Sequence, residues 1–273
     1  MAGRDTTPRQ LGKYVLLLTV AAGPILLFAS PLFLIILKSL SEGGSYVKFF
    51  SSQIYLKSLK NSLFIASAST LLISPIGLFI VSVTRKQNRT RRIVKILTSM
   101  PLVFSSYVFC IALIYIYGRA GIVNYVLGTV GLSFPANLLY STTGIIFANV
   151  LFFLPYFIIP LFSAFEELNP SIEEAAESLG STGIHKFAKI IFPQILHGFL
   201  TGALTTFLLV FSQISVVLAL GAGRTYTLTY LLFAQYEGFQ FGMANAMAVI
   251  SIGVTVLVTI SFHVVLRGVW RGK

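Results

Sequence analysis

Residues 143–165 read TGIIFANVLFFLPYFIIPLFSAF, a run without a single Asp, Glu, Lys or Arg. About 20 apolar residues in a helix cross the hydrocarbon core of a bilayer, so this stretch predicts a membrane-spanning helix. The chain has five further uncharged runs of similar length: 15–37, 61–84, 96–117, 196–220 and 244–266. Strands of a β-barrel are about half as long and alternate in polarity. The sequence therefore predicts an all-α integral membrane protein with six transmembrane helices.

The overall composition excludes a soluble protein. Of the 273 residues, 56% are hydrophobic and only 10% are charged, whereas soluble domains carry about 25% charged residues. The first uncharged run is too long for the apolar part of a signal peptide, and we expect it to be retained. The whole chain, 1–273, is interpreted as a single transmembrane domain.

The Lys and Arg residues predict the orientation, because cytoplasmic loops of membrane proteins are enriched in both. Fourteen of the 20 lie in the N-terminal tail, in the loop between the second and third runs, in the loop after the fourth run, or at the C-terminus. Both termini are therefore expected in the cytoplasm of a bacterial cell whose inner membrane the chain crosses several times. The net charge of +12 fits anionic lipid headgroups; nucleic-acid binding is the poorer explanation because the basic residues are divided among short stretches.

The chain lacks the sequence features of a catalyst. No G-x-x-x-x-G-K-[S/T] motif is present to hold nucleotide phosphates, and no Ser–His–Asp or Cys–His arrangement suggests itself. The three histidines, His185, His197 and His263, are too scattered for a metal site. We expect no enzymatic activity, metal or cofactor in this chain. The single cysteine, Cys110, has no disulfide partner.

The loop 166–195 is unusual for a cytoplasmic loop because it is acidic. It holds five of the eight acidic residues: Glu166, Glu167, Glu173, Glu174 and Glu177. Asn169 followed by Pro170 predicts the start of a short helix, and Gly180 is suited to its left-handed C-terminal cap. Ile172, Ala175, Ala176 and Leu179 share one apolar face of that helix.

A second short amphipathic helix follows, and we expect it to end at Pro193 before the fifth membrane helix. One interpretation is that this hairpin lies on the membrane surface. Anionic headgroups would repel the acidic first helix, which argues against that interpretation. A small, capped, acidic helix is better suited to docking on another protein.

These residues resemble a known signature. Glu174-Ala175-Ala176, three residues, Gly180, nine residues and then Ile190-Ile191-Phe192-Pro193 are similar to the E-A-A, x3, G, x9, I-x-L-P motif of permease subunits of ABC importers. One position departs, with Phe192 in place of Leu. The resemblance extends from about residue 60 to the C-terminus and implies the type I importer permease fold.

The resemblance implies a mechanism and partners. Two permease subunits form the path, and the loop of each docks in a groove of a cytoplasmic ABC ATPase dimer through Glu174, Ala175, Ala176, Gly180, Ile190 and Pro193. An extracytoplasmic substrate-binding protein delivers the solute, and the second permease subunit is expected to be a different chain. Closure of the ATPase dimer would switch the path between its two orientations, as in alternating access.

The substrate path is predicted from uncharged polar residues, because the six runs contain no charge for a proton relay. Gln213 is the strongest candidate, since an amide in the middle of a helix is costly to expose to lipid. Three further candidates are Ser212, Asn149 and Tyr107, for which hydrogen bonding between helices is an equally good explanation. The stretch Gly118-Arg119-Ala120-Gly121-Ile122-Val123-Asn124 resembles the G-R-x-G-x-x-N segment of polyamine, ferric iron, thiamine and phosphonate permeases. It favours a small charged solute over a sugar.

Two other classes of protein remain as alternatives. A secondary transporter or channel would work without an ATPase, and inverted-repeat symmetry or an intramembrane carboxylate would favour it. An integral membrane enzyme would need clustered His, Asp or Cys at one membrane face. Neither set of features is found in the sequence, and the acidic loop 166–195 argues against both.

Overall fold

The computed structural model describes residues 23, 27, 29–84, 88–133, 135, 138–221 and 223–271. Five helical stretches within them are long and apolar enough to cross a membrane: Gln53–Thr84, Ser106–Gly128, Thr142–Glu166, Gly183–Ser212 and Phe241–Val264. The expected helix over 15–37 falls largely outside the described residues, and the described part contributes to a shorter apolar helix, Ala29–Ser41.

Three predicted spans are confirmed nearly as drawn. The run 61–84 lies in α3 (Gln53–Thr84), 143–165 lies in α7 (Thr142–Glu166), and 244–266 lies in α13 (Phe241–Arg271). The helices extend past the predicted bounds at every end except the C-terminal end of α3, which is residue 84 as predicted.

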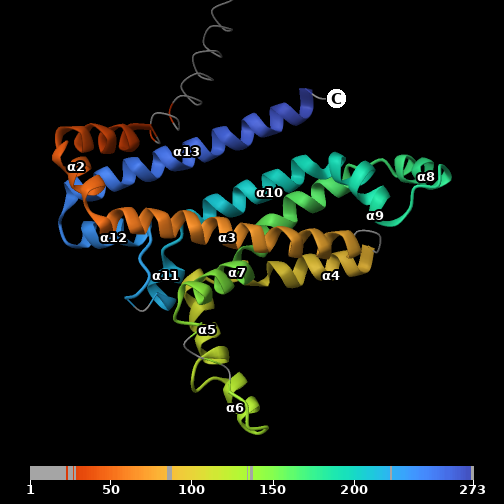
Figure 1. Cartoon of the computed structure of the whole chain (residues 1–273), viewed down its shortest axis with the longest axis horizontal. Coiled ribbons are helices and arrows are strands. Elements are labelled where there is room, and N and C mark those ends of the chain that lie inside the picture. Colours follow the sequence, from red (N-terminus) through yellow and green to blue (C-terminus); the bar gives the residue numbers. More distant parts are fainter. Residues whose placement is uncertain are drawn as a thin grey trace, which may run out of the picture.

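The core is a bundle of α3, α7 and α10 (Phe192–Ser212), which pack against one another along their lengths (Figure 1). Glycines allow two of these contacts to be backbone to backbone. A Cβ added at Gly202 would lie 2.7 Å from the carbonyl oxygen of Phe157, and one added at Gly198 would lie 2.8 Å from that of Pro160. Small residues at such crossings permit the close packing that holds membrane helices together without a hydrophobic driving force.

The predicted helix over 96–117 is wrong, because the chain breaks in its middle. Helix α4 covers Asn88–Ser99, a 3-10 turn follows at Met100–Val103, and α5 covers Ser106–Tyr117. Pro101 lies in the turn and lacks the N–H that a continuous helix would need. Ser105 then starts a new helix, since its side chain accepts a hydrogen bond from the Val108 N–H.

After α5 the chain continues into a helix that the sequence did not predict, α6 (Ile122–Gly128). The apolar span that replaces the predicted helix 96–117 is therefore Ser106–Gly128, which contains α5 and α6. In Figure 1, α5 and α6 point away from the core bundle, as does the C-terminal part of α13.

The predicted helix over 196–220 is also divided. It ends at Ser212, and α11 (Ser215–Leu220) begins after two non-helical residues. At its other end it begins earlier than expected: α9 (Gly183–Lys186) and a π-helical turn at Phe187–Ile191 run directly into α10. Pro193 therefore does not end the second loop helix, because it lies in the first turn of α10, where a missing N–H is tolerated.

The two ends of the molecule carry different structures. At one end lie α2 (Gly44–Ser51) and α12 (Leu228–Glu237), next to the beginnings of α3 and α13. At the opposite end α8 (Pro170–Ser178) projects beyond the spans, and α9 forms the start of the span Gly183–Ser212 (Figure 1). The loop 166–195 is thus presented at one end of the bundle, and the short helices α2 and α12 are presented at the other.

Candidate functional site

Helix α8 forms where the sequence predicted it, and local hydrogen bonds define both ends. The Asn169 side chain accepts a hydrogen bond of 3.1 Å from the Ser171 N–H, and Pro170 occupies the first turn. At the far end Gly180 adopts φ +79°, which is strained for residues with a Cβ. The Ser181 N–H donates to the Ala176 carbonyl and the Gly180 N–H donates to the Glu177 carbonyl, which is the Schellman arrangement.

A buried lysine joins α8 to the following helix. Lys186 on α9 is only 9% exposed. Its Nζ forms an ion pair with the Glu177 carboxylate and lies 3.7 Å from Oε2 of Glu173. Two of the loop's five carboxylates are therefore neutralised within the loop, and they fix the angle between its two helices.

Glu174 is different from these two neighbours. Its side chain is exposed and forms no ion pair with a residue that the structure describes. Of the predicted apolar face of α8 only Ala176 is buried, whereas Ile172 and Leu179 are 40% and 88% exposed. On α9, Ile184 is 86% exposed. The loop therefore presents a carboxylate and three large apolar side chains that have little packing within this chain.

The second half of the loop is continuous with a membrane helix. Ile190 lies in the π-helical turn and Pro193 follows in α10. The Gln194 Nε2 donates a hydrogen bond of 2.8 Å to the Ile190 carbonyl oxygen, and Ile191 is buried in the core. Helix α9 thus continues through the π-helical turn into α10 with no non-helical residue between them.

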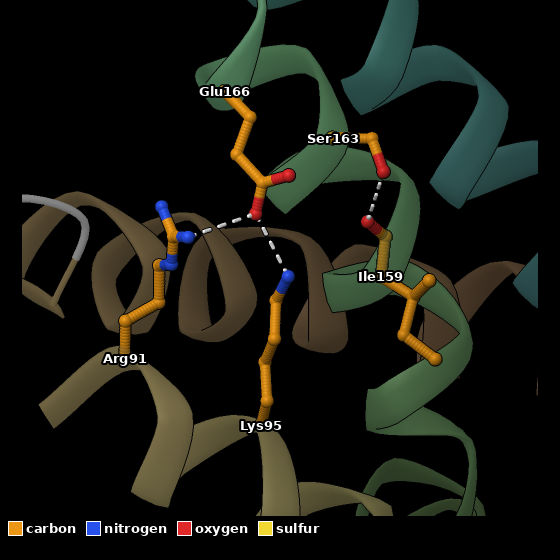
Figure 2. A network of polar contacts seen from close by, with 5 residues as sticks. All are labelled: Arg91, Lys95, Ile159, Ser163 and Glu166. Carbon is orange, nitrogen blue, oxygen red and sulfur yellow. Dashed lines mark hydrogen bonds and ion pairs between the residues drawn. The ribbon is translucent and has the colours of Figure 1, made fainter. Parts of the chain in front are cut away.

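The first half of the loop is anchored to α4 by a second charge cluster (Figure 2). Glu166, the last residue of α7, accepts a hydrogen bond of 2.8 Å from Lys95 Nζ and lies 3.4 Å from Arg91 Nη2. Lys95 Nζ also lies 5.0 Å from the centre of the Phe162 ring, a cation–π distance. These contacts hold α4 against α7 where the loop begins.

The four predicted path residues lie on or beside three different helices, α5, α7 and α10. Asn149 on α7 is 2% exposed, and its Oδ1 has no hydrogen-bond partner among the described residues. Tyr107 on α5 and Ser212 at the end of α10 are exposed. No hydrogen bond between any two of the four is found in the described part of the chain.

The prediction that Gln213 lies in the middle of a helix is wrong. The residue lies at the break between α10 and α11 with extended backbone. Its Oε1 accepts hydrogen bonds from the N–H groups of Ile214 (3.1 Å) and Ser215 (3.4 Å). The side chain therefore caps the start of α11, at a helix break of the type that lines transport sites in other membrane proteins.

Sequence reasoning missed Lys186, Lys95 and Arg91. Lys95 and Glu166 are 71 positions apart, so no local spacing predicts their pairing. Lys186 is separated from Glu177 by a turn whose two glycines, Gly180 and Gly183, both have positive φ. Helical periodicity does not continue through such a turn, and the only available signal was a basic residue close to an acidic cluster.

A bundle of membrane-spanning helices with a structured, acidic loop at one end defines a polytopic permease. The comparison with known families gives the same result: residues 73–271 match the model of the binding-protein-dependent transport system inner membrane component. The chain belongs to this family and is an inner-membrane permease of the ABC importer class, with several membrane-spanning helices.

Individual relatives are transport permeases as well. The spermidine/putrescine permease PotB of Haemophilus influenzae is 27% identical over 78% of this chain and 75% of its own. The putative 2-aminoethylphosphonate permease PhnU of Salmonella choleraesuis is 29% identical over 66% of this chain. The ferric permease FbpB of Actinobacillus pleuropneumoniae is 31% identical over 69% of this chain. The matched regions cover 63% of PhnU and 27% of FbpB.

Solved structures share the fold. A chain of a bacterial ABC transporter involved in the import of the acidic polysaccharide alginate matches 95% of this chain with a TM-score of 0.79 and 16% identity, over 96% of its own length. A chain of the alginate transporter crystallised with its periplasmic protein matches 93% of this chain and of its own, with a TM-score of 0.75 and 16% identity.

Proposed function

We propose that the chain is one permease subunit of an ABC importer and that the loop 166–195 couples it to a cytoplasmic ATPase. Glu174, Ala175, Ala176 and Gly180 would form the docking helix, and Ile190 and Pro193 would connect it to the membrane. ATP hydrolysis would then take place in the partner, and this chain would supply half of the translocation path.

The exposed surface of α8 is the observation that supports this proposal most directly. Leu179, the C-cap residue of α8, and Ile184 on α9 are 88% and 86% exposed, and α8 itself projects beyond the membrane spans. Exposed apolar side chains beside an unpaired carboxylate are typical of an interface whose partner is absent. The motif resemblance and the family membership support an ATPase as that partner.

The connection from α8 to the core supports a coupling role. Lys186 joins α8 to α9, and α9 continues through the π-helical turn into α10. When the ATPase dimer closes, a pull on α8 would be transmitted along this path to α10, which packs against α7 and α3. Packed helices of this type move as rigid bodies and not by gradual deformation.

The decisive experiment is co-purification from the native membrane in a mild detergent. We expect the wild-type chain to retain an ATPase with a nucleotide-binding motif, together with a second permease of different sequence. Glu174→Arg should lose the ATPase and keep the second permease, because it reverses one exposed charge and leaves the helix caps intact. Glu167→Arg is the matched control, since that side chain is exposed in the same loop but precedes α8. Retention of the ATPase by Glu174→Arg would refute the docking proposal.

We further propose that the chain forms a single domain, 1–273, with both termini in the cytoplasm. The end that carries α2 and α12 would then face outward and receive an extracytoplasmic substrate-binding protein. It carries exposed lysines on three successive helices: Lys38, Lys48, Lys57 and Lys60. A binding protein that docks there would complement them with acidic side chains.

The proposed substrate is a small charged solute of the polyamine, ferric iron, thiamine or phosphonate type. It rests on the names of the relatives and on the segment 118–124, in which the Asn124 side chain donates a hydrogen bond of 2.9 Å to the Gly118 carbonyl. Uptake of labelled spermidine, 2-aminoethylphosphonate, thiamine and ferric iron by cells with and without the transporter would test it. Accumulation of a neutral sugar instead of all four would contradict it.

A further inference from the structure

Helix α4 has two chemically different faces, of which the proposed coupling uses only one. Arg91 and Lys95 face α7 and hold Glu166 (Figure 2). The opposite face carries Arg89, Arg92 and a series of apolar residues. It is exposed, and neither arginine forms an ion pair with a described residue.

The exposed face changes in polarity along the helix axis. Arg89, Arg92, Ile93 and Ile96 follow the spacing i, i+3, i+4 and i+7, which places all four on one side of α4, and Met100 is the first residue of the 3-10 turn that follows. The two cations come first and the apolar residues follow. Ile93, Ile96 and Met100 are all about half exposed, at 47%, 56% and 55%.

The ends of the neighbouring spans show which end of α4 lies at the membrane boundary. The span α3 ends at Thr84, α4 begins at Asn88 beside it, and the span α7 ends at Glu166, which pairs with Arg91 and Lys95 of α4. Arg89 and Arg92 therefore lie at the level where two membrane spans end. Ile93, Ile96 and Met100 follow along the chain toward the bend at Pro101.

An apolar pocket continues the apolar part of the face. It has a volume of about 360 Å³ and lies where the chain bends from α4 into α5, with Leu97, Met100 and Pro101 on one side and Phe104 and Val108 on the other. The bend at Pro101 creates it, since a continuous helix would leave no concave side.

We propose that this face binds an anionic phospholipid, with the phosphate at Arg89 and Arg92 and one acyl chain along Ile93 and Ile96 into the pocket. The order of the groups along α4, two cations at the membrane boundary and then about two turns of apolar surface, matches the order of groups in the lipid. Arginine binds phosphate oxygens with paired donors.

The test measures how many molecules of phosphatidylglycerol and phosphatidylcholine the purified full chain, with its co-purifying subunits, retains in native mass spectrometry. We expect selective retention of phosphatidylglycerol, with an affinity about thirty-fold lower in Arg89→Gln/Arg92→Gln, because each basic residue near an anionic surface contributes several-fold. Ala112→Phe, which fills the pocket from α5, should lower retention without any change in charge. Lys57→Gln/Lys60→Gln removes the same charge at the other end of α3 and should have no effect.

Four results would overturn the proposal. Equal retention of the two lipids by the wild type would show that no anionic site exists. Equal losses in the arginine and lysine pairs would show that net charge alone attracts the lipid. Loss of the second permease from the arginine variant, with lipid retention unchanged, would assign the face to a protein interface. Displacement by inorganic phosphate would also count against it, because free phosphate does not fill the apolar pocket.

Discussion

At the scale of single residues, the geometry of the loop 166–195 depends on one buried cation. Lys186 lies between the carboxylates of Glu173 and Glu177, and its side chain is only 11% exposed. Breaking a partly buried ion pair from one side leaves the remaining charges without compensation. The loop's geometry is therefore more sensitive to Lys186 than to the exposed residues of the signature motif.

We predict that Lys186→Met uncouples transport from ATP hydrolysis. Glu173 and Glu177 would repel each other and α8 would lose its fixed angle to α9, at a cost of about 1–3 kcal/mol in local stability. The measurement is the amount of solute transported per ATP hydrolysed in reconstituted vesicles. The charge-exchanged pair Lys186→Glu/Glu177→Lys should recover part of the coupling, and Lys189→Met, at an exposed position, should behave like the wild type. Normal coupling in Lys186→Met would show that the ion pair is dispensable.

Gln213 is the second residue with a specific local role, because it lies at the break between α10 and α11. Its Oε1 caps α11, while its Nε2 has no hydrogen-bond partner in the described part of the chain. Gln213→Leu removes both groups, whereas Gln213→Glu keeps the accepting oxygens and removes the donor.

We predict that Gln213→Leu lowers the transport rate without blocking membrane insertion, since the lost cap is worth about 1 kcal/mol. Uptake by Gln213→Glu then separates the two roles. Wild-type uptake in Gln213→Glu would assign the residue to the cap alone, and a loss equal to that of Gln213→Leu would favour a contact with the solute. Wild-type uptake in Gln213→Leu would remove the residue from the path.

At the scale of elements, the sequence predicted the helices that are apolar throughout and failed where helices break. The run 143–165 carries its own signal, because each residue independently favours the hydrocarbon core. The breaks at Pro101 and Gln213 lie within runs that are equally apolar, so composition does not report them. A proline in α7, Pro155, leaves that helix unbroken, which shows why a proline alone does not predict a break.

The loop 166–195 shows the same division between local and distant signals. Asn169, Pro170 and Gly180 act within a few residues of their own positions, and all three were placed correctly from the sequence. The pairs Lys95–Glu166 and Lys186–Glu173 connect separate elements. Their formation depends on how α4, α7 and α9 pack, which no single segment encodes.

The contact between α10 and α7 gives a prediction at this scale. Gly202→Ala should lower the melting temperature in detergent, because the new Cβ would lie 2.7 Å from the Phe157 carbonyl oxygen and overpacking costs about 1–3 kcal/mol. Gly253→Ala is the matched control: it lies in α13 and its added Cβ meets no atom within 4 Å. An equal response of the two variants would mean that α10 and α7 are not in backbone contact.

At the scale of the whole molecule, the two ends have different partners in the proposed function. The end with α8 must reach a cytoplasmic ATPase, and the end with α2 and α12 must reach an extracytoplasmic binding protein. The core of α3, α7 and α10 connects the two ends. Orientation in the membrane is therefore the property on which the rest of the proposed mechanism depends.

We predict that a membrane-impermeant maleimide labels Ser41→Cys in intact spheroplasts and labels Ser178→Cys only after the membrane is opened. Ser41 lies beside α2 and Ser178 ends α8, and both are exposed, so each reports the side on which its end of the bundle lies. The native Cys110 is fully buried and should remain unlabelled in both preparations, which provides an internal control. The reverse pattern would place α8 outside the cell, where no ATP is available, and the coupling role of the loop would then fail while the membership of the family would stand.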